Sequence, residues 1–394
     1  MNKGKIINFE WMCDYNRYNP NDFDIIKTQL IKNDIDSAVA DGYNVIVGAY
    51  FLDGFLQPAE RYAEFISHLN EIKSYAASVG ITDLYLITGH GEELKDTPIP
   101  YFHIDYNLRI LYNSYKHDID NLPEYNPQNN KFLFLTGMPD RANRIGLLSK
   151  YYDETLLDNA EWTFFSPWAP ADKQWCREHL KHYSDEAYLK FLTECDRQFD
   201  DRFESAKPYY GNYSLEELDV DWLDVVDTEW VRAPTLIDSS VYNNTVLSIV
   251  SEGPNYWGDN YDFVTEKVWR EFLHKQPFIL AGWPDQMRYL KKLGYKTFEE
   301  YMLIPDYAYI EDEDQRLNAV VKNTKHFLET HTSHSEAIAL DVEHNYNLLF
   351  KYIKEQDATF IYFNTVLGIS QEQIDFYTDQ TGYKNLVMRP PTDV

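Results

Sequence analysis

The sequence predicts an α/β protein with two domains, in which parallel strands alternate with helices. Short apolar runs typical of buried strands alternate with longer segments of helical spacing, and this rhythm is present in both halves of the chain. The chain has 394 residues, more than one hydrophobic core usually holds. A polar stretch with two prolines, residues 122–130 (LPEYNPQNN), is the best linker candidate. Helices of this length between strands imply right-handed crossovers, with binding sites at the carboxyl ends of the strands.

The expected elements follow in order along the chain. In the first domain, residues 1–125, we expect strands at 5–10 (KIINFE), 43–50 (YNVIVGAY) and 83–88 (DLYLIT), and helices at 22–41 and 58–80. In the second domain, residues 131–360, we expect strands at 131–136, 162–166, 245–251 and 277–282, and helices at 141–152, 265–275, 284–293, 311–330 and 334–354. The acidic and aromatic segment 171–239 does not fit this alternation, and we interpret it as an insertion. Residues 361–394 form a C-terminal extension that contains a helix at 370–377 and could return to the first domain.

Composition narrows the class of protein. The net charge of −28 argues against a general polyanion binder. A local basic pocket is compatible with this charge, because salt limits the electric field of a charged group to a distance of about 10 Å. The three cysteines have no metal-like spacing, which favours a reducing compartment. The sequence has no apolar signal core and no apolar run long enough to span a membrane. We therefore expect a soluble protein in the cytoplasm of a bacterium or of an infected host cell.

The segment 245–282 is the strongest candidate for a binding site. A strand leads into a glycine-containing loop, and a helix then opens with Thr265, Glu266 and Lys267. The free N–H groups and the dipole of a helix N-terminus favour an anion. Thr265 can cap the helix and Glu266 suits the dipole, so both have a plain structural explanation. Lys267 opposes the dipole by a few tenths of a kcal/mol unless an anion lies between them, and a diphosphate would satisfy that arrangement.

The same segment also resembles a known family. Residues 247–282, LSIVSEGPNYWGDNYDFVTEKVWREFLHKQPFILAG, resemble the donor-binding region of α-1,3-fucosyltransferase-like enzymes. They are still more similar to uncharacterised glycosyltransferases of phage and marine bacterial genomes, in which stretches like 276–279 (QPFI) and 293–298 (LGYKTF) follow. The resemblance covers residues 131–301 with gaps. The Thr-Glu-Lys core is short, and its combination with both flanking stretches is more specific than the core alone.

The resemblance implies the glycosyltransferase-B fold, with two Rossmann-like domains facing across a cleft and the nucleotide on the C-terminal one. Carried over by matching position, Glu266 would hold ribose or sugar hydroxyls and Lys267 the diphosphate. Tyr261 would line the nucleotide pocket. Ser251 and Glu252 would lie at the strand end that faces the donor. The nucleotide-sugar is then a co-substrate, and we expect no cofactor.

A second stretch fits the same family. Residues 131–152, KFLFLTGMPDRANRIGLLSKYY, resemble the segment that opens the C-terminal domain and supplies a phosphate-binding arginine. Arg144 matches that role best, with Arg141 as the substitute. A guanidinium suits a diphosphate because its planar fork donates hydrogen bonds in pairs. The alternative is a solvated helix face.

The N-terminal half should bind the acceptor and supply a general base if the enzyme inverts at the anomeric carbon. Our candidates for the base are His90 and Glu92, after the third strand. A tight turn with a hydrogen-bonded imidazole is the structural alternative for His90. Further carboxylates follow expected strands and keep the assignment open: Glu10, Asp14, Asp53 and Glu93.

We expect an enzyme that moves a hexosyl, fucosyl or pentosyl group from a nucleotide-sugar to a carbohydrate or other hydroxyl acceptor without a metal. Asp-x-Asp pairs occur, but 64 acidic residues make such pairs expected by chance. One alternative is a phage-type DNA-base glycosyltransferase, which the net charge disfavours because a DNA-facing cleft needs a basic stripe. Another is a non-catalytic module that binds nucleotide or carbohydrate.

Overall fold

The computed structural model describes residues 2–9, 25–50, 59–88, 97–105, 108–109, 111–112, 119, 129–136, 142–164, 239–252, 264–331 and 335–378. These residues form an α/β protein with two four-stranded sheets, and all strand pairs in both sheets are parallel. The chain divides into two compact units. Of the described residues, those up to 112 and from Phe350 onward belong to the first unit, and those from 119 to Leu349 belong to the second.

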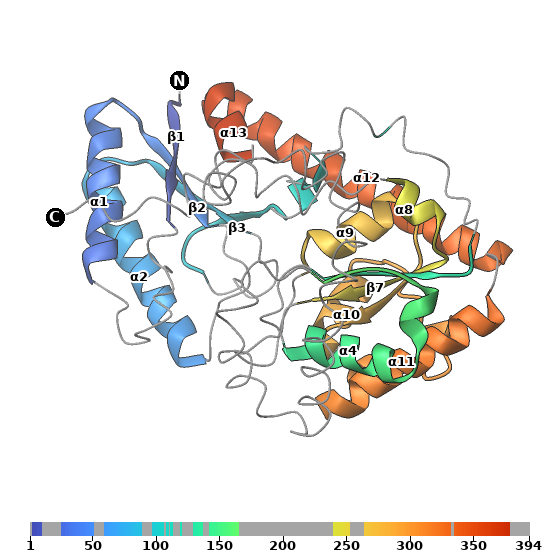
Figure 1. Cartoon of the computed structure of the whole chain (residues 1–394). Coiled ribbons are helices and arrows are strands. Elements are labelled where there is room, and N and C mark those ends of the chain that lie inside the picture. The colour runs from blue at the N-terminus through green and yellow to red at the C-terminus, as the bar shows by residue number, and fades with distance from the viewer. Residues whose placement is uncertain are drawn as a thin grey trace, which may run out of the picture. The chain divides into compact units, whose positions relative to one another are not determined.

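The sheet of the first unit has the order β1-β2-β3-β4 (Figure 1). Its strands are β1 (Gly4–Asn8), β2 (Val45–Tyr50), β3 (Asp83–Thr88) and β4 (Tyr101–His103), and α1 (Ile25–Ala40) and α2 (Ala59–Ser78) connect the first three. The three strands expected from the sequence in this half are confirmed. β4 was not expected, because three residues are too few to show a period.

Each face of this sheet packs against a different part of the chain. On one face, Ile7, Ile46 and Leu86 pack against apolar residues of α1 and α2. On the other, Ile6, Val47 and Ile87 share a core with α12 (Glu336–Thr365) and α13 (Gln371–Thr378), through residues such as Phe363 and Ile374. Both faces are covered, as the continuous apolar runs of parallel strands require.

The chain that follows α12 is hydrogen-bonded to β1. Gly4 N–H donates to Gly368 O at 3.2 Å, and Gln373 Oε1 accepts from Ile6 N at 3.1 Å. A Cβ on Gly4 would collide with the carbonyl oxygen of Leu367, so this position needs glycine. α12 runs eleven residues past the expected end at residue 354. The sequence contains no Gly or Pro between residue 336 and Gly368, and nothing therefore ends the helix earlier.

The sheet of the second unit has the order β6-β5-β7-β8. Its strands are β5 (Phe132–Thr136), β6 (Ala160–Phe164), β7 (Leu247–Ser251) and β8 (Phe278–Ala281). All four were expected, although β6 begins two residues earlier than residue 162. All five residues of β7 are buried, as expected for a central strand.

The helices of the second unit lie on both faces of its sheet. They are α4 (Ala142–Asp153), α8 (Ser239–Asn243), α9 (Glu266–Leu273), α10 (Pro284–Lys292) and α11 (Glu313–Thr330). Figure 1 shows α8 and α9 on one side of the sheet and α4 and α11 on the other. α4 and α11 contact each other through Tyr151 and Thr324, whose hydroxyl oxygens are 2.8 Å apart. Among the described residues, no helix is both long and apolar enough to span a membrane.

Candidate functional site

The second sheet has a switch point between β5 and β7. The chain passes from β5 through α4 to β6 on one side, and from β7 through α9 to β8 on the other, while β5 and β7 are neighbours. In open parallel sheets, ligands bind outside the carboxyl ends of the strands at such a point. The candidate site therefore lies where β7 ends at Ser251 and where α4 and α9 begin.

The start of α9 is fixed to the end of β7 by a buried carboxylate. Thr265 is the N-cap of α9 and accepts from Lys267 N at 3.4 Å. Thr265 N donates to Glu252 Oε1 at 2.9 Å, and Thr265 Oγ1 lies 2.8 and 2.9 Å from the two carboxylate oxygens of Glu252. Glu252 has no exposed surface. Both carboxylate oxygens of Glu252 are therefore engaged by the helix cap.

The charge of Lys267 is balanced within the protein. Lys267 Nζ donates to Glu266 Oε1 at 2.8 Å and to Thr265 Oγ1 at 3.1 Å. Burial by itself would raise the pKa of Glu266, but the ammonium of Lys267, helped by Arg270, outweighs burial and holds this pKa below its ordinary value. The side chains of Glu266 and Lys267 keep 18% and 24% of their exposure, so an incoming ligand can reach the pair. Glu266 thus supplies the anion that a lysine in the first turn requires.

α4 brings polar side chains to the same strand end from the other face of the sheet. Asn143 Nδ2 donates to Glu252 O at 2.7 Å and to Ser251 Oγ at 3.4 Å. Arg144 Nη2 donates to Ser251 O at 3.4 Å, and Arg144 is buried. The two cations that the resemblance assigns to phosphate, Arg144 and Lys267, therefore belong to the two helices that meet the end of β7.

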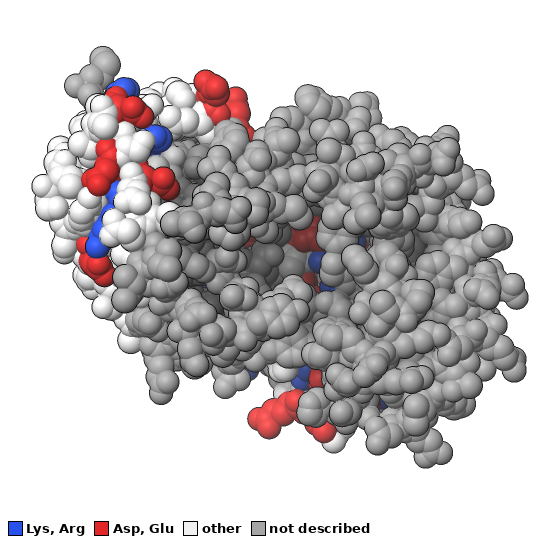
Figure 2. All heavy atoms as spheres, turned by 60° about the vertical axis from the view of Figure 1, so that its left-hand side comes forward, with Lys and Arg blue, Asp and Glu red and all other residues white. Residues whose placement is uncertain are grey.

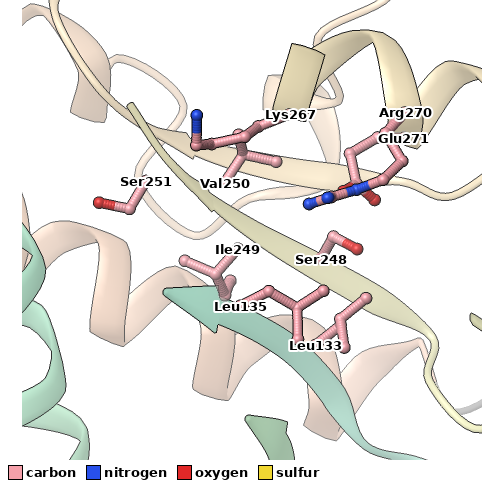
Figure 3. A pocket seen from close by; sticks show the side chains of 9 residues that line it. All are labelled: Leu133, Leu135, Ser248, Ile249, Val250, Ser251, Lys267, Arg270 and Glu271. Carbon is pink, nitrogen blue, oxygen red and sulfur yellow. The ribbon is translucent and has the colours of Figure 1, made fainter. Parts of the chain in front are cut away.

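A small pocket continues from this point between α9 and the sheet. It is lined by three residues of α9 and six of the two central strands: Lys267, Arg270, Glu271, Leu133, Leu135, Ser248, Ile249, Val250 and Ser251. Figure 3 shows Arg270 and Glu271 side by side near Ser248, with Leu133 and Leu135 on the neighbouring strand. The pocket has room for roughly one water molecule, so it is too small to be a sugar or base site.

The inner end of the pocket holds a buried carboxyl group. Glu271 Oε1 accepts from the Tyr242 hydroxyl at 3.4 Å and lies 3.9 Å from Arg270 Nε. Burial raises the pKa of Glu271 to about 7, although Arg270, Ser248 and Tyr242 each act to lower it. The Ser248 hydroxyl is near enough to lower this pKa, yet among the described residues neither Ser248 Oγ nor Glu271 Oε2 has a partner at hydrogen-bond distance. Near neutral pH this carboxyl group can therefore hold or release a proton.

His274 extends the polar face of α9 by one turn. Its ring stacks on Tyr242, with 3.9 Å between the ring centroids and 7° between the planes. Burial, and after it the charge of Arg270, lowers the pKa of His274 to about 3. The imidazole is thus neutral at physiological pH.

Sequence reasoning missed Asn143, Ser248, Arg270, Glu271 and His274. Lys267, Arg270, Glu271 and His274 follow the spacing i, i+3, i+4, i+7 of one helix face. A charged face of this kind normally lies in solvent. Here Arg270, Glu271 and His274 are buried. Nothing in the local sequence distinguishes the two cases.

Several predicted site residues lie outside the described residues. They are the candidate bases His90 and Glu92, the alternatives Glu10, Asp14, Asp53 and Glu93, and the donor-side residues Arg141 and Tyr261. Within the described ranges, no group of three or more His, Cys, Asp or Glu residues could hold a metal ion. Comparison with models of protein families, with curated proteins and with solved structures found no match.

Proposed function

We propose that the protein is a glycosyltransferase that moves a sugar from a nucleotide-sugar donor to a hydroxyl acceptor, without a metal and with the glycosyltransferase-B arrangement. The observation that carries the proposal is the convergence of α4 and α9 on Ser251 and Glu252 at the switch point of the second sheet. This is the place where α/β sheets of this topology bind nucleotides. The matching residues that the structure describes lie there: Arg144, Ser251, Glu252, Thr265, Glu266 and Lys267.

The proposed donor takes the place of an internal contact. Lys267 is paired with Glu266 at 2.8 Å, and a diphosphate oxygen would replace Glu266 on the ammonium. Glu266 is then left to accept hydrogen bonds from ribose or sugar hydroxyls. The positive end of the α9 dipole and the positive charge of Arg144 beside Ser251 also favour an anion.

Thermal-shift screening against UDP-, GDP-, ADP- and CMP-sugars tests the donor site. A ligand that binds only the folded protein raises its melting temperature by an amount set by its excess over Kd. We expect one nucleotide class to stabilise the protein. Lys267→Ala should need an at least about tenfold higher ligand concentration for the same rise in melting temperature, because a charge-assisted hydrogen bond is lost. Lys322→Ala, on an exposed position of α11, is the matched control. If no class stabilises the wild type at millimolar concentration, the donor site is wrong.

Hydrolysis of the stabilising donor separates an enzyme from a binding module. Water then acts as the acceptor: its oxygen bonds to the anomeric carbon while the bond from that carbon to the diphosphate breaks. Release of free nucleotide and free sugar above the uncatalysed rate supports a transferase. Tight binding with no release favours the non-catalytic module.

The DNA-base alternative has less support. Figure 2 shows acidic side chains interspersed with basic ones on the described surface in that view, rather than a basic stripe. A DNA-facing enzyme needs such a stripe for phosphate contacts. Salt-dependent binding of the protein to duplex DNA would favour this alternative over a carbohydrate acceptor.

A further inference from the structure

Glu252 is a buried carboxylate with an unusual set of partners. Within the described residues, its carboxylate hydrogen bonds all come from Thr265: the backbone N–H donates to Oε1, and the single hydroxyl hydrogen is shared between Oε1 and Oε2. A buried charge is stable only when it is hydrogen-bonded, and the positive end of the α9 dipole adds to that stabilisation. Both carboxylate oxygens of Glu252 therefore face the cap of α9.

These contacts fix the direction of the Thr265 hydroxyl. An ionised carboxylate only accepts hydrogen bonds, so the hydroxyl hydrogen of Thr265 must point at Glu252. The lone pairs of Thr265 Oγ1 are left for donors from α9. Lys267 supplies two such donors, its backbone N at 3.4 Å and its ammonium Nζ at 3.1 Å. The order of donation thus runs from Lys267 through Thr265 to Glu252.

We propose that Glu252 is a positioning residue that orients the Lys267 ammonium through the Thr265 hydroxyl, and this inference rests on the proposed donor site. Glu252 does not touch the donor. It sets the polarity of the hydroxyl that holds the lysine in place. A purely structural cap would need only an acceptor for Thr265 N and would be indifferent to that polarity.

Glu252→Gln separates these two roles. Glutamine has the shape of glutamate, and its Oε1 can still accept from Thr265 N. Its amide nitrogen can only donate, so it would occupy a lone pair of Thr265 Oγ1 that Lys267 uses in wild type, while the hydroxyl can still donate to Oε1. The ammonium of Lys267 then loses an acceptor while the helix keeps its cap. Thr265→Ser keeps the whole chain of contacts, and Thr265→Val removes it.

The first test measures binding of UDP and GDP by calorimetry in a double-mutant cycle. We expect Glu252→Gln to lower the affinity for the nucleotide that binds wild type by about tenfold. Thr265→Ser should leave this affinity unchanged. In a Lys267→Met background, Glu252→Gln should have no further effect, because it acts through the lysine. An equal loss in both backgrounds would mean that Glu252 only stabilises the helix, and the proposal would be wrong.

The second test needs no ligand. Reductive methylation of the intact protein, read at Lys267 by mass spectrometry, reports how firmly the amine is held. We expect severalfold faster labelling of Lys267 in Glu252→Gln and Thr265→Val, with Lys322 unchanged. Equal rates at Lys267 in wild type and Glu252→Gln would overturn the positioning role. If wild type binds neither UDP nor GDP while the labelling rates do change, the donor site fails and the positioning of Lys267 stands.

Discussion

The hydroxyl of Tyr242 donates a hydrogen bond to the buried carboxyl group of Glu271, with 3.4 Å between Tyr242 Oη and Glu271 Oε1. The ring of Tyr242 also stacks on His274. One tyrosine of α8 therefore contacts two buried titratable groups of α9. Their pKa values move in opposite ways, because burial disfavours the charged form of each: the value for Glu271 rises to about 7 and that for His274 falls to about 3.

Replacing Glu271 by Gln should make the slope of folding stability against pH more positive than in wild type in mildly acidic solution. In wild type the folded state keeps the Glu271 proton up to about pH 7, whereas the unfolded chain loses it near the ordinary value of 4.5. The contribution of Glu271 to the free energy of unfolding therefore falls as pH rises across that window, by on the order of 3 kcal/mol. Urea unfolding at pH 4.5, 5.5 and 6.5 measures the slope. Glu329→Gln, on an exposed position, should keep the wild-type slope. An unchanged slope in Glu271→Gln would show that burial does not raise the pKa of this carboxyl group.

Replacing His274 by Phe should change the slope of the free energy of unfolding against pH in the direction opposite to Glu271→Gln. The unfolded chain takes up a proton on His274 below about pH 6.5, and the folded protein does not do so until about pH 3. The contribution of His274 to the free energy of unfolding is therefore full above pH 6.5 and is lost as pH falls, by about 3 kcal/mol at pH 4.5. Phenylalanine keeps the stack on Tyr242 and removes the titration.

The contributions of these two groups to the free energy of unfolding should nearly cancel between pH 4.5 and 6.5, so the two variants should depart from the wild-type profile in opposite directions. The same urea series on His274→Phe checks this. Two parallel profiles would contradict the burial of one group or the other.

Asn143 should matter for the stability of the second unit more than an ordinary surface amide. Its Nδ2 donates to Glu252 O at 2.7 Å, and Asn143 is buried. Asn143→Ala leaves a buried carbonyl group without this donor and should lower the free energy of unfolding by about 1–3 kcal/mol. Asn347→Ala, which removes an exposed bond to Glu343, should change it by no more than about 0.5 kcal/mol. Denaturant midpoints of both variants measure the difference, and similar midpoints would mean that the contact with Glu252 adds little.

The strands and the position of the candidate site could be predicted from the sequence because both depend on local signals. β7 is a continuous apolar run, and Thr265 is a capping residue directly before an amphipathic helix. The side-chain partner of that cap could not be predicted. Glu252 lies thirteen residues before Thr265. Only the fold shows that the carboxylate of Glu252 bonds this cap.

The partner of Lys267 could not be predicted from the sequence either. Its position in the first turn of α9 indicated a missing anion, and the structure supplies one in Glu266, the adjacent residue. Neighbours i and i+1 do not face each other along a regular helix, so this pair is not expected from spacing. The burial of the polar face of α9 could not be predicted from the sequence, because burial of Arg270 and Glu271 depends on where β5, β7 and α8 lie.

Glu266 should compete with phosphate for Lys267, and its replacement should affect two ligands in opposite ways. In Glu266→Gln the ammonium loses its anionic partner at 2.8 Å, and one negative charge leaves the start of α9. Inorganic pyrophosphate should then bind about threefold more tightly, since a repulsive carboxylate near the surface is gone. UDP or GDP should gain less or lose affinity, because Glu266 would no longer accept from the ribose hydroxyls as an anion. Calorimetry with pyrophosphate and the nucleotide, on this variant and on Glu329→Gln, gives the ratio of the two affinities. If the ratio stays at the wild-type value, Glu266 has no part in recognising the hydroxyls, and the division of roles between Glu266 and Lys267 is wrong.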